Sequence, residues 1–266
     1  MREFAAMTTN GPPVDSSPAA NPGADAVARP ALPGFAITAL TPDEATSVTA
    51  AMLIVMLAAG GENVAAMVPV ETGIDDPCEA GSHGALIRWA AGHLDDPRQV
   101  TPFALEAKRS AMHAADASGT LLHGAAFELA RESLSDGRTT MIVLDAIGPL
   151  DPITPSLTML DLLARWALPA IIVEPLSRAT VGHVRLVALA MLSRDIPVAG
   201  VVLTPFPVSD DDQDGAAEAI RETLAAMLGC PVVIRSPVML MHDRSILLDA
   251  ARQSELHRVM PRRTVT

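Results

Sequence analysis

Lysine is almost absent from this 266-residue sequence, in which Lys108 is the single example. Any site that needs a lysine at a defined place, such as a phosphate-binding loop, can therefore be checked against one residue. Cysteine is also scarce: Cys78 and Cys230 lie far apart and form no CxxC pair. That spacing indicates neither a disulfide framework nor a zinc site.

Basic charge and long hydrophobic runs are missing too. The chain has 19 basic and 31 acidic residues and a formal net charge of −12, which argues against a nucleic-acid or anionic-membrane partner. The longest apolar run, "VTAAMLIVMLAA" (48–59), is too short to span a bilayer. The N-terminal segment has no apolar core of signal-peptide length behind a basic start. We therefore predict no secretion signal and expect a cytoplasmic protein.

Strand-like and helical segments alternate along most of the chain. Apolar runs typical of buried strands are "GFAITAL" (34–40), "VAAMVPVET" (64–72), "TTMIVLDAI" (139–147), "LPAIIVEPL" (168–176), "IPVAGVVLTPF" (196–206) and "CPVVIRSPV" (230–238). Helical patterns lie between them. This alternation predicts a three-layer α/β/α fold with a mainly parallel sheet.

The predicted domain has a tail at each end. We assign residues 34–255 to the α/β domain. Residues 1–33 are rich in Pro, Ala, Gly and Ser, so they cannot bury enough apolar surface to become ordered, and we predict a disordered tail. Residues 256–266 are predicted to be a flexible C-terminal tail.

The segments at the predicted strand ends follow the order found in one enzyme family. They are "VPVETG" (68–73), "SHGALIRWAAG" (82–92), "MIVLDAIGPLDPI" (141–153), "ATVGHVRLVALAML" (179–192) and "IPVAGVVLTP" (196–205). Over about residues 35–240 the chain resembles the dethiobiotin synthases (dethiobiotin synthetases). These P-loop enzymes use ATP and CO2 to close a ureido ring. The resemblance implies a P-loop NTPase-like architecture of the SIMIBI type.

The phosphate loop of that family is degenerate in this chain. The two glycines, the lysine and the threonine of the family loop fall on Thr38, Glu44, Ala45 and Thr46, so only the threonine is kept. Glycines let backbone N–H groups approach phosphate oxygens, and the lysine supplies positive charge. Each lost charge-assisted contact is worth about 1.5–3 kcal/mol.

A helix start takes the place of the loop. Thr41, Pro42, Asp43 and Glu44 predict a capping box in which Thr41 is the N-cap and Glu44 the N3 residue. Such a box uses the N–H groups that a phosphate would need. We therefore interpret the segment as a former phosphate loop; a helix start without that ancestry is the alternative, and it predicts the same absence of ATP binding.

The other family positions are changed in parallel. By resemblance, the second lysine falls on Val68, a following threonine is kept as Thr72, the Mg-binding Asp falls on Gly84, the strand-end Glu becomes Asp145, and the adenine-reading Asn-Asp becomes Thr204 and Pro205. Asp145 is the one weak candidate for a metal ligand, although an aspartate that caps a loop explains it equally well. Lys108 matches no family lysine.

These losses lead to three hypotheses. The first is a catalytically degenerate homologue with no cofactor, which acts as a homodimer or as a heterodimer with an authentic synthase. The second is an active ATP- and Mg-dependent synthase in which another cation, such as Arg88 or Arg109, replaces the lysines. Arginine is a poor substitute in a tight phosphate cradle. The third is a scaffold unrelated to biotin, because fold alone does not fix function.

Overall fold

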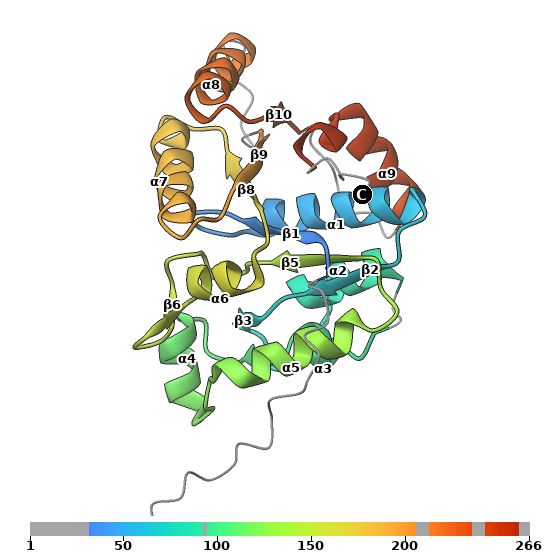
Figure 1. Ribbon diagram of the computed structural model, residues 1–266, viewed down its shortest axis with the longest axis vertical. Coiled ribbons are helices and arrows are strands. Elements are labelled where there is room, and N and C mark those ends of the chain that lie inside the picture. Colours follow the sequence, from blue (N-terminus) through green and yellow to red (C-terminus); the bar gives the residue numbers. More distant parts are fainter. Residues whose placement is uncertain (1–31, 93–94, 206–212, 236–242, 261–266) are drawn as a thin grey trace, which may run out of the picture. The chain divides into compact units, whose positions relative to one another are not determined.

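The computed structural model describes residues 32–92, 95–205, 213–235 and 243–260. Its centre is a six-stranded sheet in the order β10-β9-β8-β1-β5-β2, and every neighbouring pair is parallel (Figure 1). The strands are β1 (Gly34–Thr38), β2 (Val64–Met67), β5 (Thr140–Leu144), β8 (Ala170–Pro175), β9 (Val198–Thr204) and β10 (Val232–Ile234). The predicted parallel α/β fold is confirmed.

Helices cover both faces of this sheet. They are α1 (Glu44–Ala59), α2 (His83–Ala91), α3 (Pro97–Val100), α4 (Ala111–Ser118), α5 (Gly124–Ser135), α6 (Met159–Trp166), α7 (Thr180–Leu192), α8 (Gln213–Leu228) and α9 (Arg244–Gln253). The connection through α1 runs toward the β2 edge, and the connection through α7 runs toward the β10 edge. Because parallel crossovers are right-handed, the two helices lie on opposite faces. Helix α1 packs beside α2 and α9, and α7 packs beside α8.

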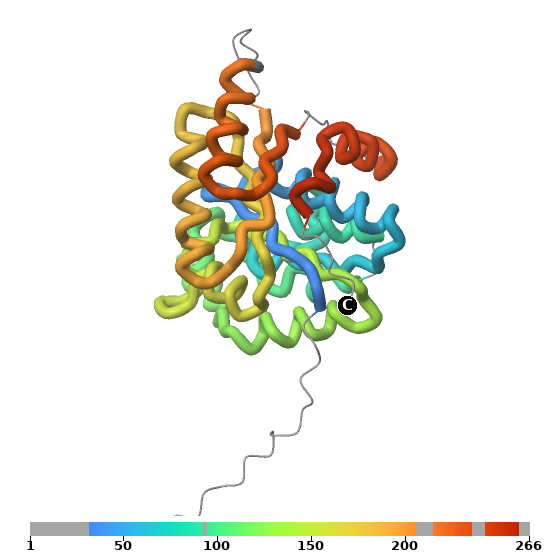
Figure 2. The backbone as a smooth tube through the Cα atoms, turned by 45° about the horizontal axis from the view of Figure 1, so that its top comes forward, coloured from blue at the N-terminus to red at the C-terminus, as the bar shows by residue number. Residues whose placement is uncertain are grey.

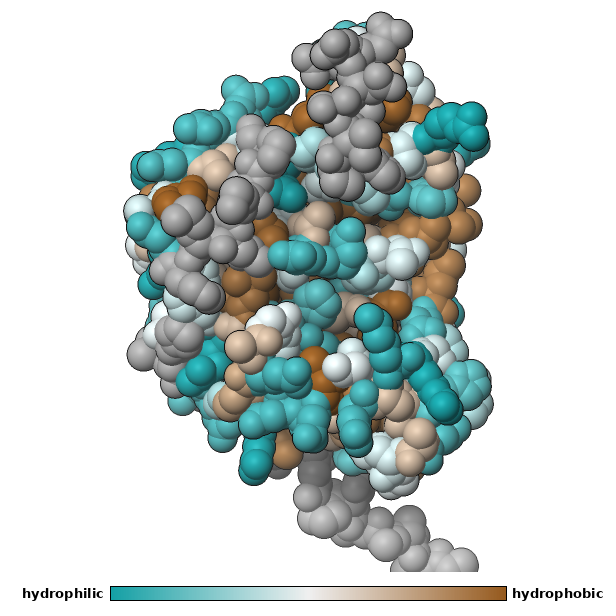
Figure 3. All heavy atoms as spheres, turned by 180° about the vertical axis from the view of Figure 1, so that it is seen from behind, coloured by the Kyte–Doolittle hydropathy of each residue, from teal (hydrophilic) through white to brown (hydrophobic). Residues whose placement is uncertain are grey.

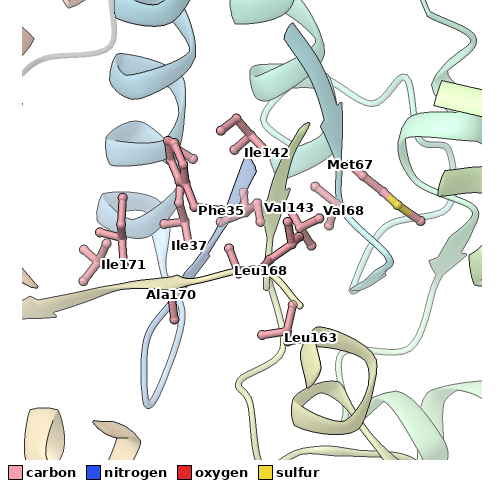
Figure 4. Close-up of a cluster of buried hydrophobic side chains, with 14 of the residues drawn as sticks. Phe35, Ile37, Met67, Val68, Ile142, Val143, Leu163, Leu168, Ala170 and Ile171 are labelled. Atoms are coloured by element: carbon pink, nitrogen blue, oxygen red, sulfur yellow. The ribbon is translucent and has the colours of Figure 1, made fainter. Parts of the chain in front are cut away.

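The strands of the sheet form the core. Every residue of β5 and β2 is buried, as are the last four residues of β1, because helices cover both faces. Figure 4 shows Phe35 and Ile37 of β1 beside Ile142 and Val143 of β5, and Val68, which follows β2, next to Val143. In the part of the chain that is described, no helix is long and apolar enough to cross a membrane.

The predicted strand 64–72 is divided into two. Only β2 joins the large sheet, whereas β3 (Val70–Thr72) pairs in parallel with β4 (Phe103–Leu105) in a separate small sheet. Pro69 lies at the break and has no N–H to donate to a strand ladder. A third, antiparallel pair is formed by β6 (Pro152–Thr154) and β7 (Leu157–Thr158).

The C-terminal boundary predicted at residue 255 is placed too early. A 3-10 helix follows at Leu256–Val259, and both Leu256 and Val259 are fully buried. A Cβ atom at Gly200 of β9 would lie 2.6 Å from the Cβ of Val259, so the helix contacts the sheet closely. This packing was not predicted because four residues are too few to show a helical period. Residues 261–266 and the predicted N-terminal tail up to residue 31 lie outside the described part of the chain. Figure 2 shows the 3-10 helix close to β9 and β10.

Candidate functional site at the carboxyl ends of the strands

The strands of the large sheet all end at one edge, and the connections from β1 and β8 leave this edge in opposite directions. In open α/β sheets, ligands bind at such a switch point. Thr38, Asp145, Glu174, Thr204 and Arg235 are the buried polar residues at or directly after the ends of β1, β5, β8, β9 and β10. The topology therefore brings together residues almost 200 positions apart.

Thr38 and Asp145 are joined by a hydrogen bond inside the protein. The Thr38 hydroxyl donates to Asp145 Oδ2 over 2.7 Å, and both side chains are fully buried. The other carboxylate oxygen accepts the N–H groups of Ile147 at 3.1 Å and Gly148 at 2.8 Å. Asp145 thus fixes the loop after β5. Among the described residues, no group of three His, Cys, Asp or Glu side chains is placed to hold a metal ion.

Burial raises the pKa of Asp145 from 3.8 to about 6. The three hydrogen bonds favour the ionised carboxylate and oppose this shift, while the nearby negative charge of Asp151 adds to it. Removal from water is the largest of these effects, because a buried charge loses its hydration. Near neutral pH this carboxyl group lies close to its titration point.

The start of α1 is capped, but the predicted capping box is wrong in register. Asp43 is the N-cap residue instead of Thr41, and its partner is Thr46 instead of Glu44. Asp43 Oδ1 accepts the N–H of Thr46 at 3.1 Å, and the Thr46 hydroxyl accepts the N–H of Asp43 at 3.2 Å. Glu44 is exposed in the first turn and Ala45 is half-buried.

Two physical reasons explain this shift. Aspartate is a stronger N-cap than threonine. The loop before it also packs tightly against the loop after β5, since a Cβ at Gly148 would lie 3.1 Å from the carbonyl oxygen of Leu40 and 3.6 Å from Pro42. This contact holds residues 40–42 outside the helix. The observed capping box uses the N–H groups of Asp43 and Thr46 at the start of α1.

Two further ionisable residues, Glu174 and Arg235, interact electrostatically with Asp43 at the start of α1. Glu174 is buried, and one of its oxygens lies 2.7 Å from Nδ1 of His183. Burial raises the pKa of Glu174, and Asp43 contributes in the same direction. Arg235 is also buried, which lowers the pKa of its guanidinium, while Asp43 opposes that shift. The ionisable groups here are therefore two acids, Asp43 and Glu174, with Arg235 and with His183, which is paired with Glu174.

Arg235 is the cation that sequence reasoning missed. The two arginines proposed as replacements have other surroundings: Arg88 donates to the carbonyl oxygen of Asp95, and Arg109 is exposed after β4. Lys108 is exposed, and its Cβ and Cγ lie 3.4 Å from where a Gly73 Cβ would be. The one signal in the sequence that could have indicated Arg235 is the position of this arginine directly after the apolar residues 232–234 of the last predicted strand.

The remaining predicted positions serve the fold. Val68 is fully buried in the core and donates its N–H to the carbonyl of Val100 (Figure 4). Thr72 is half-buried at the end of β3, and Gly84 is buried in the first turn of α2. The carbonyl of buried Thr204 accepts the N–H of Leu176 at 2.8 Å.

The sequence is similar to known proteins. Residues 35–240 match a family model described as "AAA domain". The ATP-dependent dethiobiotin synthetase BioD of Anaeromyxobacter dehalogenans is 30% identical over 182 residues, which cover 67% of this chain and 79% of that relative. The chain belongs to the dethiobiotin synthetase family.

Two further comparisons add detail. The dethiobiotin synthetase of Rhodopseudomonas palustris is 30% identical over 145 residues, 54% of this chain, and the match spans 64% of the length of that synthetase. Among solved structures, the MinC:MinD cell division protein complex of Aquifex aeolicus aligns with a TM-score of 0.49 and 12% identity, over 87% of this chain and 98% of that chain.

Proposed function

We propose that this chain is a non-catalytic member of the dethiobiotin synthetase family that acts by binding. One observation carries the proposal: the Asp43–Thr46 capping box closes the helix start where the family holds phosphate. A carboxylate about 4 Å from a phosphate repels it by about 4 kcal/mol at an effective dielectric constant of 20. The sole lysine lies elsewhere, beside Gly73.

The binding function that we propose is self-association, with a family synthetase as the other candidate partner. Helix α7 exposes three leucines on its outer face, together with Arg185. Leu186, Leu189 and Leu192 are 47%, 56% and 57% exposed, respectively, and they follow one side of the helix. Figure 3 shows hydrophobic surface along the right-hand edge of that view, on the side where α7 lies. An apolar stripe of this kind is typical of an interaction surface.

An active ATP- and Mg-dependent synthetase is the second candidate function. The observation that favours it is the buried guanidinium of Arg235, which is close enough to Asp43 for their charges to interact. On this hypothesis the arginine replaces the missing lysines. The capped helix start and the repulsion from Asp43 speak against it, since an arginine does not reproduce a compact ammonium in a phosphate cradle.

Calorimetric titration with Mg-ATP separates the two functions. We expect no heat of binding at millimolar nucleotide, whereas the ATP-dependent relative from Anaeromyxobacter dehalogenans, titrated in parallel, shows binding. Complementation of a bacterial strain that lacks its synthetase is the second measurement. Growth without biotin would establish the active enzyme and overturn the proposal. Absence of both activity and any self- or synthetase association would favour a scaffold unrelated to biotin.

A further inference from the structure

Gly84 has no room for a side chain. A Cβ atom at this position would lie 2.0 Å from the hydroxyl oxygen of Thr101 and 3.3 Å from its Cβ. A Cβ atom does not approach another heavy atom to within 3 Å in a folded protein, so one of the two residues would have to move. Thr101 is held in place: it is 2% exposed, it ends α3, and its N–H donates to the carbonyl of Pro97 at 2.8 Å.

Glu71 completes the enclosure of Gly84. Its two carboxylate oxygens accept the N–H groups of His83 at 2.6 Å and of Gly84 at 3.0 Å. Glu71 therefore satisfies two free N–H groups of α2, beside the Ser82 side chain, which accepts the N–H of Ala85. The side chain of Glu71 is 3% exposed, and its Oε2 would lie 3.5 Å from a Cβ at Gly84.

We infer that the magnesium position of the family has been closed by packing, and not merely emptied by loss of the aspartate. The inference rests on the proposed function only in that Gly84 occupies the place of the family's Mg-binding Asp. An aspartate there would overlap Thr101 and would bring a second carboxylate next to Glu71. Magnesium needs near-octahedral oxygen ligands, and both oxygens of Glu71 already accept backbone N–H groups. The residues present do not fit the ion.

The Thr101 hydroxyl acts here by its volume. Its oxygen is buried and has no hydrogen-bond partner among the described residues. Replacement by valine, which keeps the shape and removes the hydroxyl, therefore leaves the obstruction in place, whereas alanine removes it. This difference gives a double-mutant test that does not depend on nucleotide binding.

The test compares melting temperatures of purified full-length variants. Gly84→Ala should lower the melting temperature by about 3–10 °C, as expected for an overpacked site in a domain of this size. Adding Thr101→Ala should recover at least half of that loss, and adding Thr101→Val should not. Gly182→Ala on α7 is the matched control, because a Cβ there meets nothing within 4 Å; it should leave the melting temperature unchanged or raise it.

Restoring the aspartate tests the metal directly. Gly84→Asp should melt at least as low as Gly84→Ala, and magnesium chloride should not raise its melting temperature. The inference fails if Gly84→Ala melts like the natural chain, if Thr101→Val rescues it as well as Thr101→Ala does, or if magnesium stabilises Gly84→Asp. Each of these outcomes can occur while Mg-ATP titration of the natural chain still shows no binding, so the two proposals fail separately.

Discussion

The hydroxyl of Thr38 donates to the carboxylate of Asp145 over 2.7 Å, and this bond joins the carboxyl ends of β1 and β5. Both strands are neighbours in the parallel sheet, so the bond lies at the carboxyl edge of that sheet. Here it is an internal contact between two fully buried side chains. The bond therefore connects two loops of the same chain at the edge where ligands bind in open α/β sheets.

The stability of the protein should decrease as the pH rises from about 4 to about 6, through Asp145. Because the folded-state pKa is raised from 3.8 to about 6, the folded protein holds a proton that the unfolded chain has lost in this range. Stability then falls with pH, by up to about 3 kcal/mol for this group. Asp145→Asn cannot titrate. The free energy of unfolding of the natural chain relative to this variant, from urea titrations at each pH, should fall by that amount.

Thr38→Val is the control for the same group. It removes the hydroxyl that favours the ionised carboxylate, so the fall in stability should extend to higher pH than in the natural chain. The free energies of unfolding of the natural chain and of Asp145→Asn are compared at each pH. If their difference does not change between pH 4 and pH 7, Asp145 does not titrate as its burial implies.

Removing the cap of α1 should weaken the fold measurably. Asp43→Ala deletes the side chain that accepts the N–H of Thr46, and we expect a loss of about 1 kcal/mol in the free energy of unfolding. Thr41→Ala is the matched control, since Thr41 lies outside the helix; it should change stability by less than about 0.5 kcal/mol. If urea denaturation shows a larger loss of stability for Thr41→Ala than for Asp43→Ala, the result supports the Thr41–Glu44 capping box instead.

Self-association through α7 should depend on its central leucine. Leu189→Glu replaces the central leucine by a carboxylate. Arg185, one turn earlier on the same exposed side, can pair with it, but taking such an ion pair out of water at an interface still costs several kcal/mol. We expect light scattering coupled to gel filtration to give a dimer mass for the natural chain and a monomer mass for this variant. Leu129→Glu on α5 is the control, because Leu129 is 69% exposed and lies on another helix. A dimer that persists in Leu189→Glu, or a natural chain that is monomeric, argues against this surface.

Much of the fold could be predicted because its signals are local. Buried parallel strands are continuous apolar runs, so the segments that begin at Gly34, Thr140 and Ala170 were found near their true bounds. The break at Pro69 had a local signal as well, a residue without an N–H inside an apolar run. The 3-10 helix after Glu255 had none, since four residues do not show a period and its burial depends on Gly200 in a distant strand.

The sequence by itself determined that residues 38–46, which we align with the phosphate loop of the family, contain no glycine and no lysine, because a missing residue type needs no structure to be established. It also placed Thr38 and Asp145 at strand ends. Only the tertiary structure decided which side chains meet at that edge. The charge of Asp43 acts on Arg235, and Thr101 fills the space beside Gly84, because the fold brings together segments that are distant in the sequence. Such contacts depend on three-dimensional packing, and no periodicity along the chain records them.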